Sequence, residues 1–286
     1  DLIVRASGFA EYRLAIAPGG TRQDLEIRVV PATRTEEVTV ATTRVEQRAG
    51  DVPATVNVIN HIEIHQSPAV VVDDVLRQIP SFSLARRTSS LAAHPAAQGV
   101  SLRGIGSSGV SRTLVLMDGV PVNDAFGGWV YWSRIPLESI EHIEVVDGAS
   151  SSLYGNYAMG GLISITTTPA SRRTMELRAQ YGNRQSPRID LHASDVRGRL
   201  GMVVDVNAFT TDGYATVVRN ERGPIDGAST ADFKNVNIKL EYALSNRVRT
   251  FVRAALGSPR TAANAISVRI TRIISGTASS SSWPQS

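Results

Sequence analysis

The sequence predicts an α+β domain over residues 50–168, followed by a series of antiparallel β-strands and preceded by a short β-sandwich remnant. Two observations carry this prediction. Within the domain, β-prone runs flank a helix with one apolar stripe at the spacing i, i+3, i+4 and i+7: Val72, Val75, Leu76 and Ile79. In the last third of the chain, apolar and polar residues alternate strictly, as they do on strands that bury one face.

The N-terminal segment, residues 1–33, contains β-prone runs on either side of a Pro-Gly-Gly turn at 18–20. It resembles the end of a carboxypeptidase-regulatory-like β-sandwich, so we expect short strands here. Residues 34–49 follow as a β-prone segment with a polar linker. An ordinary connecting strand is the simplest interpretation of that segment.

Within the α+β domain, residues 54–60 are expected to form a strand. Ser67 and Pro68 are the residue types preferred at the N-cap and the first position of a helix, and Pro80 ends that helix. A short helical piece and two further strands complete the domain, at residues 136–141, 142–148 and 162–168.

A glycine pattern in the middle of the domain, Gly104, Gly106 and Gly109, matches the G-x-G-x-x-G fingerprint of a dinucleotide-binding turn. That fingerprint works only where the glycines open a helix whose N–H groups receive the pyrophosphate. Here an apolar run, the pair Asp118-Gly119 and a second apolar run follow, which is a strong signal for a β-hairpin. The sequence therefore disfavours a nucleotide site.

Five segments after residue 169 show the alternation of half-buried strands. In one of them Val236, Ile238 and Leu240 alternate with Asn237 and Lys239. The other segments are residues 175–182, 188–194, 200–209 and 247–253. Strands of this kind suit a membrane barrel whose apolar side chains face lipid, but a soluble antiparallel sheet gives the same pattern.

The composition disfavours several classes of function. The chain of 286 residues contains no Cys, which excludes a disulfide framework and a thiolate nucleophile. Its net charge of +4 is scattered, without the basic stripe that a nucleic-acid site requires. No apolar run approaches the length of a transmembrane helix, and no catalytic motif is present. We therefore predict neither an enzyme nor a nucleic-acid partner.

The pattern His61, Glu63, His65 is the one candidate for metal ligands that the sequence offers. On a strand, these three side chains would face the same way. However, no further ligand follows at a recognisable spacing, and polar residues at the end of a strand explain the pattern as well. The sequence predicts no metal and no cofactor.

Several motifs resemble the plug of TonB-dependent outer-membrane receptors and follow in the same order: DDVLRQIPSF, VSLRGIG, LVLMDGVPVND and RIPLESIEHIEVVDGASSSLYGNYAMGGLISITTT. The resemblance covers nearly all of residues 50–168. It implies a plug that blocks the channel of a transmembrane β-barrel in the outer membrane of a Gram-negative-type envelope. The residues that carry the motifs are Arg103, Gly104, Asp118, Gly119, Tyr154, Gly155, Gly160 and Gly161.

One position departs from the family pattern. Where the family usually has Arg, this chain has Asp147. That position is associated with charge contacts between plug and barrel, so the seating of this plug is expected to differ. Arg103 does match the family.

The resemblance also implies partners. A short box near the start of the plug pairs with the energy-transducing protein TonB, and the segment EEVTVA resembles it: Glu36, Glu37, Val38, Thr39, Val40 and Ala41. Its alternation, uninterrupted by Pro or Gly, suits a strand that is added to the edge of a partner's sheet. Lipid would surround the barrel, and the imported ligand would be a metal–siderophore, a cobalamin or an oligosaccharide.

Two connecting segments, residues 81–99 and 123–132, are expected to be apical plug loops. They hold two cations and three large aromatic side chains that we predict to face a ligand: Arg86, Arg87, Trp129, Tyr131 and Trp132. Packing against the barrel wall is the alternative interpretation for Trp129 and Trp132.

The length of the chain indicates a fragment. A plugged transporter has about 22 strands of about 9–11 residues each, and the residues after Pro169 are too few to supply them. Residues 169–253 would be the first barrel strands. Residues 254–286 contain no acidic residue and lose the alternation, which predicts an aberrant or disordered tail. The alternative function is a non-transporting secreted or surface module for binding or adhesion.

Overall fold

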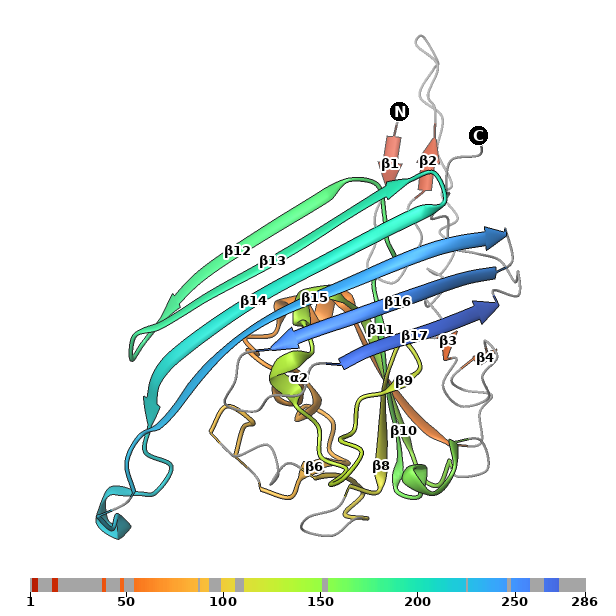
Figure 1. Ribbon diagram of the computed structural model, residues 1–286. Coiled ribbons are helices and arrows are strands. Elements are labelled where there is room, and N and C mark those ends of the chain that lie inside the picture. The colour runs from red at the N-terminus through yellow and green to blue at the C-terminus, as the bar shows by residue number, and fades with distance from the viewer. Residues whose placement is uncertain are drawn as a thin grey trace, which may run out of the picture.

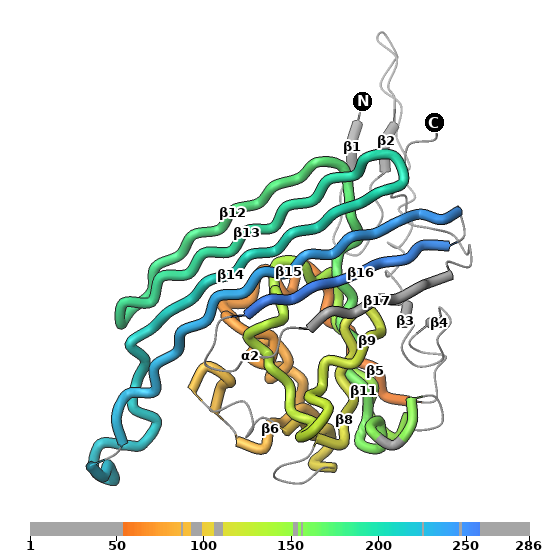
Figure 2. Tube along the Cα trace, viewed as in Figure 1, coloured from red at the N-terminus to blue at the C-terminus, as the bar shows by residue number. Residues whose placement is uncertain are grey.

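An α+β domain lies against one face of a curved antiparallel sheet in the computed structural model of the chain (Figures 1 and 2). The structure describes residues 2–4, 12–14, 38–39, 47–48, 54–86, 88–92, 99–105, 111–150, 154–224, 226–245, 248–257 and 265–272. None of the helices in these ranges is long and apolar enough to cross a membrane.

The α+β domain is built on a five-stranded sheet with the order β5-β10-β11-β8-β9. Its neighbouring strands are antiparallel, except that β11 and β8 run parallel. The expected strands at 54–60, 142–148 and 162–168 are β5, β10 and β11, so this part of the prediction is confirmed. The bounds are β5 (Thr55–Asn60), β10 (Ile140–Asp147), β11 (Gly161–Thr167), β8 (Thr113–Met117) and β9 (Val120–Pro121).

Two short α-helices follow β5: α1 (His61–Gln66), which the sequence did not predict, and α2 (Val72–Leu76), which carries most of the predicted apolar stripe but begins later than the predicted cap at Ser67. Helix α1 starts at a capping box in which Asn60 Oδ1 accepts from Glu63 N and Glu63 Oε2 accepts from Asn60 N. Ser67 therefore ends this helix as its C-cap and does not begin one. Helix α2 has no side-chain cap.

The apolar core of the domain lies between one face of the sheet and these helices. The predicted stripe Val72, Val75, Leu76 and Ile79 is buried, although α2 itself is shorter than that stripe. Opposite it, alternate residues of β10 and β11, such as Ile143 and Ile163, are fully buried. The domain also contains 3-10 helices η3 (Trp132–Arg134), η4 (Leu137–Ser139) and η5 (Asn156–Ala158).

The predicted hairpin at Asp118-Gly119 joins β8 to β9. Both turn residues have positive φ, 50° and 72°, as the two-residue turn requires. Leu116 pairs with Pro121 and Met117 with Val120 across the turn. Between Gly104 and β8 the described residues contain no helix, and Gly106 and Gly109 lie outside the described residues.

The second large sheet is an antiparallel meander, β12 to β17 in chain order (Figure 2). Its last two strands extend past residue 253, so the predicted tail 254–286 contains strand residues. The bounds are β12 (Thr174–Gly182), β13 (Ser186–Arg197), β14 (Leu200–Tyr214), β15 (Ser229–Ser245), β16 (Val248–Gly257) and β17 (Ala265–Arg272), with η6 (Arg219–Glu221) between β14 and β15.

Three short antiparallel pairs lie outside the two large sheets. They are β1 (Leu2–Val4) with β2 (Tyr12–Leu14), β3 (Val38–Thr39) with β4 (Gln47–Arg48), and β6 (Phe82–Leu84) with β7 (Val100–Leu102). In the first pair, β2 lies within a run that the sequence predicted as a strand, and residues 18–33 lie outside the described residues. The carboxypeptidase-regulatory-like domain itself remains a prediction.

Gly161, the first residue of β11, is a position where we expect a side chain to be very costly. Its φ is +137°, and an added Cβ would lie 2.6 Å from the carbonyl oxygen of Val146. Gly104 also has a positive φ, +71°, but open space around it. Gly104→Ala should lower the free energy of unfolding by about 1–2 kcal/mol, and Gly161→Ala by about 3 kcal/mol or more, as measured by urea denaturation. Equal losses in the two variants would contradict this packing.

Candidate functional site

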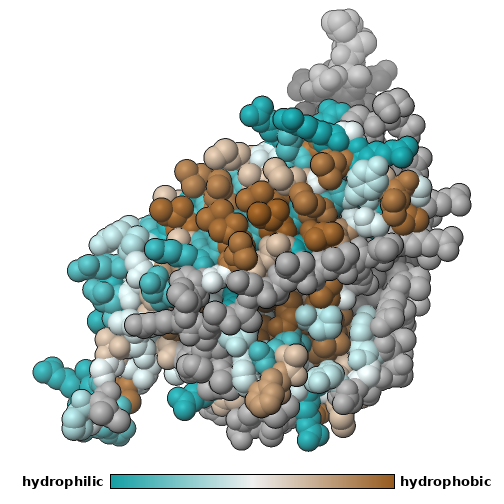
Figure 3. All heavy atoms as spheres, viewed as in Figure 1, coloured by the Kyte–Doolittle hydropathy of each residue, from teal (hydrophilic) through white to brown (hydrophobic). Residues whose placement is uncertain are grey.

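The six-stranded sheet turns its polar face to the α+β domain and its apolar face outward. The sequence predicted this alternation, and the structure confirms it. The polar face includes Arg188, Asp190, His192, Asp205, Asn207, Asn235, Asn237, Lys239, Glu241 and Arg253. The outward residues are 41–75% exposed: Met175, Leu177, Tyr181, Ile189, Met202, Leu240, Tyr242, Val252 and Leu256. Figure 3 shows brown, apolar atoms gathered over this face of the sheet.

The first contact between domain and sheet is centred on Asp118, in the β8–β9 turn. Its Oδ1 accepts from Thr167 N at 2.8 Å, and its Oδ2 accepts from Thr167 Oγ1 and Arg253 Nη2, each at 2.7 Å. Lys239 Nζ lies 3.4 Å from the same oxygen. Burial alone would raise the pKa of Asp118, but Lys239, Arg253 and the Thr167 hydrogen bonds outweigh burial and hold that pKa below its usual value.

The second contact is centred on Glu138, in η4. Arg178 Nη1 of β12 lies 3.0 Å from Glu138 Oε1, and Arg188 Nη2 of β13 lies 3.6 Å from the same oxygen. Arg188 also approaches Asp190 at 2.5 Å and donates to the carbonyl of Ala69 at 3.0 Å. This contact therefore joins η4, and the loop before α2 that contains Ala69, to β12 and β13, the first two strands of the sheet.

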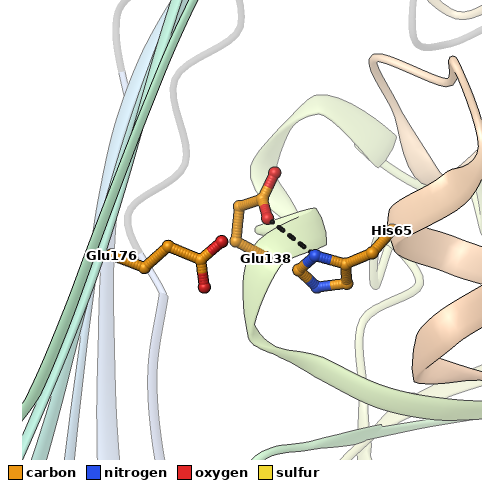
Figure 4. A group of neighbouring side chains, drawn as sticks. All are labelled: His65, Glu138 and Glu176. Atoms are coloured by element: carbon orange, nitrogen blue, oxygen red, sulfur yellow. Dashed lines mark ion pairs between the residues drawn. The ribbon is translucent and has the colours of Figure 1, made fainter.

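His65, Glu138 and Glu176 form a group whose ligand atoms lie within 4.8 Å of one another (Figure 4). A guanidinium already serves as the cation of this group, because Arg178 lies 3.0 Å from Glu138, 3.8 Å from Glu176 and 3.2 Å from His65 Nδ1. We therefore assign the group to an ion-pair network rather than a metal centre.

The neighbouring histidines do not form the metal site that their spacing suggested as a hypothesis. His61, Glu63 and His65 belong to a helix, so they do not share a strand face. His61 Nδ1 lies 2.9 Å from the carbonyl oxygen of Ile140, and Glu63 takes part in the capping box. A hydrogen bond from Arg178, which can only donate, requires His65 Nδ1 to accept, and the same Nδ1 lies 3.3 Å from Glu138 Oε2. Burial, followed by His61 and Arg178, lowers the pKa of His65, which favours the neutral ring.

The loop at residues 123–129 is rigidly braced. Asn123 accepts from Val115 N and donates to the carbonyls of Thr113 and Gly128. Asp124 Oδ1 accepts from the backbone N–H of Phe126 and the next residue, at 3.0 and 2.9 Å. The sequence analysis missed Phe126, whose side chain is 97% exposed at the tip of this loop. The signal in the sequence was Asp124, an Asx-turn residue two positions before the aromatic Phe126.

The predicted ligand-facing residues occupy different environments. Trp129 and Tyr131 are half-buried on the braced loop, and Arg134 stacks on the Tyr131 ring with its Cζ 4.3 Å from the centroid. Trp132 differs from the expectation, because it is 1% exposed and packs on Phe82 in the core. Arg86 is exposed, and Arg87 lies outside the described residues.

The segment that follows Arg86 is anchored to α2. Asp73 accepts from Ser90 Oγ at 2.5 Å and Ser90 N at 3.0 Å, and Asp74 accepts from Ser89 Oγ at 3.2 Å. Arg77 donates to the carbonyl of Thr88 at 2.7 Å. Burial raises the pKa of Asp73 to about 6, against the opposing effect of the Ser90 hydroxyl.

Asp147, where the family usually has Arg, pairs within the domain. Its Oδ2 lies 3.7 Å from Arg103 Nε, and Arg103 Nη2 donates to Thr55 Oγ1 at 2.8 Å. These side chains line a cavity of about 440 Å³ at the end of the sheet. Among the described residues, Asp147 makes no ion pair with the six-stranded sheet.

Only part of the predicted TonB box is described. Val38 and Thr39 form β3 and pair with Arg48 and Gln47 of β4. Glu36, Glu37, Val40 and Ala41 lie outside the described residues.

Comparisons with known proteins support the plug prediction. Residues 48–162 match the family "TonB-dependent Receptor Plug Domain". The vitamin B12 transporter BtuB of Vibrio vulnificus is 36% identical over 149 residues, which cover 52% of this chain and 23% of that protein. The BtuB of Vibrio cholerae is 30% identical over 214 residues, 72% of this chain and 33% of that protein.

Solved structures agree on the fold. The siderophore receptor PirA from Acinetobacter baumannii has a TM-score of 0.55 at 19% identity, covering 71% of this chain and 31% of that one. The ferric yersiniabactin uptake receptor FyuA from Yersinia pestis has a TM-score of 0.54 at 21% identity, with the same coverage. The chain thus spans about a quarter to a third of the length of the relatives it matches.

Residues 48–162 therefore match the plug domain of TonB-dependent receptors, and the strands that follow resemble part of these receptors' barrel. TonB-dependent receptors are transporters of the Gram-negative outer membrane and not enzymes, which agrees with the predicted class and location.

The Asp118 contact leads to a prediction about stability. Asp118→Asn preserves the size of the side chain and a residue type suited to positive φ. It removes the carboxylate that Lys239 and Arg253 share and leaves Glu241 as the buried acid beside Lys239. We expect it to lower the free energy of unfolding at pH 7 by about 3 kcal/mol, as measured by urea denaturation. Because the folded-state pKa is lowered, the contribution is present above the ordinary pKa of Asp and is lost as pH falls through the folded value.

The control is Asp195→Asn, which removes an exposed ion pair with Arg197 and should cost less than about 1 kcal/mol. A loss of similar size in both variants would show that Asp118 does not hold the domain to the sheet.

Proposed function

We propose that the chain is part of a TonB-dependent outer-membrane receptor that binds a scarce nutrient and imports it by energy-coupled movement of its plug. The observation that carries the proposal is the two-faced sheet: polar side chains hold the plug, and apolar side chains up to 75% exposed face outward. The hydrocarbon of a lipid bilayer is a favourable environment for such an apolar outer face. The hydrogen bonds between neighbouring strands pair the backbone N–H and C=O groups. The alternative, a secreted binding or adhesion module, needs a further layer to cover that apolar face.

The proposed ligand is a cobalamin, a metal–siderophore or an oligosaccharide. Relatives named for vitamin B12 and for siderophores support the first two classes. The proposed contacts on the braced loop are the exposed Phe126 and the half-buried Trp129, and the half-buried Tyr131 lies just beyond that loop. The exposed Arg86, which precedes the segment anchored to α2, is the fourth proposed contact. Large aromatic faces on a rigid loop bind a bulky ligand at little cost in conformational entropy.

The proposed energy source is TonB, acting through the box at residues 36–41. An outer membrane holds no ATP and no ion gradient of its own, so a plug must be moved from the periplasmic side. The β-pairing of Val38 and Thr39 supports an extended conformation in this segment. An extended segment can add a strand to a partner's sheet and transmit force to the plug.

Ligand contact is tested by Phe126→Ala in the complete receptor. Removal of an exposed aromatic face should weaken binding about tenfold while leaving insertion unchanged. Binding is measured by titration with cyanocobalamin and with ferric siderophores on outer-membrane preparations. The control is Tyr157→Ala, which removes another exposed aromatic, in η5. If Phe126→Ala binds as tightly as the control, Phe126 does not contact the ligand.

Energy coupling is tested by Val38→Pro, because proline removes the backbone donor and fixes φ. Uptake of the radiolabelled ligand should fall to background, while binding at the cell surface is retained. Val38→Ala keeps the donor and should transport at close to the normal rate. Normal uptake by the Pro variant would exclude this segment as the coupling element.

A further inference from the structure

The contact around Glu138 has more acidic than basic groups. Glu138 of η4 shares the guanidiniums of Arg178 and Arg188 with two further carboxylates. These are Glu176 of β12, 3.8 Å from Arg178, and Asp190 of β13, 2.5 Å from Arg188. Three carboxylates therefore compete for two cations. The Asp118 contact is balanced, since Asp118 and Glu241 face Lys239 and Arg253.

The surrounding histidines do not correct this imbalance. The Nδ1 of His65 lies 3.2 Å from Arg178 Nη2 and 3.3 Å from Glu138 Oε2, and burial, followed by His61 and Arg178, lowers the pKa of His65 and so favours the neutral ring. That ring lies 4.0 Å from the ring of His61, whose Nδ1 faces the Ile140 carbonyl. His192 of β13 lies 2.6 Å from Asp205, so any positive charge it acquires is taken up by that pair. The contact carries one negative charge in excess.

That excess charge is most costly on Glu138. Its residue is 8% exposed, whereas the Glu176 side chain is 56% exposed and solvated. Neither Glu138 oxygen has a hydrogen-bond donor among the described residues. Arg178 and Arg188 approach Oε1 as ion pairs, and Oε2 lies 3.3 Å from His65 Nδ1 (Figure 4). A buried carboxylate with incomplete compensation favours its neutral form.

We propose that Glu138 is a proton-binding site that fastens the plug to β12 and β13 more tightly in acid, while Asp118 anchors the plug independently of that proton. Protonation leaves Asp190 and Glu176 balanced by the two arginines. It also gives the buried carboxyl group a proton that it can donate. The role of this site in transport rests on the proposed function, but the contact itself can be tested without a ligand.

The direction of the effect follows from linkage. Burial, only partly offset by Arg178 and Arg188, raises the pKa of Glu138. A raised folded-state pKa means that the contribution is fully present below the ordinary pKa of Glu and is lost as pH rises through the folded value. The contact at η4 therefore loosens toward neutral pH. Asp118 behaves in the opposite way, because its pKa is lowered.

The experiment is hydrogen exchange in the complete receptor without ligand, read by mass spectrometry between pH 5 and pH 8 and corrected for the intrinsic pH dependence of exchange. Protection of peptides that cover η4 should fall about threefold or more as pH rises, and peptides that cover the β8–β9 hairpin should not change. Glu138→Gln, which imitates the protonated form, should remove the pH dependence.

Two further variants separate the explanations. Glu176→Gln removes a solvated carboxylate and should leave the pH dependence in place. Asp190→Asn restores two carboxylates for two arginines without altering Glu138, and should reduce the dependence even if Glu138→Gln fails to fold. Constant η4 protection in the unmodified receptor, or an unchanged pH dependence in Glu138→Gln, would overturn the proposal. If the unmodified receptor takes up no ligand but its η4 peptides keep the pH-dependent protection, the proposed function is wrong and the proton-binding site stands.

Discussion

Lys239 and Arg253 face each other across the β15–β16 ladder, and like charges directly opposite one another destabilise a sheet. The carboxylate of Asp118 lies against both cations and makes this arrangement stable. Asp118 is also the first residue of the β8–β9 turn, with φ of 50°. One side chain thus closes a hairpin of the plug and joins the plug to the strands. The rest of the structure depends on this contact, because it fixes which face of the sheet the plug meets.

The charges across this seam have a consistent polarity. In each ion pair between plug and sheet among the described residues, the acid belongs to the plug and the base to a strand: Glu138 with Arg178 and Arg188, and Asp118 with Lys239 and Arg253. Buried pairs of this kind contribute little net stability, but they penalise any placement that separates the partners. The arrangement therefore specifies one placement of the plug against the sheet.

The loops are held by local hydrogen bonds rather than by apolar packing. Asn123 and Asp124 brace one loop, and Asp73 with Asp74 anchors the other through Ser89 and Ser90. This bracing leaves Phe126 free to project without burying it. A hydrogen-bonded loop with an exposed aromatic would suit the ligand contact that we propose for Phe126.

The sequence alone determined the features that depend on neighbours along the chain. Period-two alternation placed Lys239 and Leu240 on opposite faces of one strand, and Asp118-Gly119 specified a turn that needs positive φ at both positions. The start of the stripe-bearing helix was misplaced because Ser67-Pro68 is a plausible cap, whereas α2 begins at Val72 without a side-chain cap. The reciprocal pair Asn60 and Glu63 caps a separate helix, α1, that the sequence did not predict. Only the tertiary structure decided that Arg178 fills the space among His65, Glu138 and Glu176, that Trp132 is core, and that Phe126 is exposed. These outcomes depend on contacts between residues as far as 113 positions apart, and no local pattern encodes which distant side chain arrives.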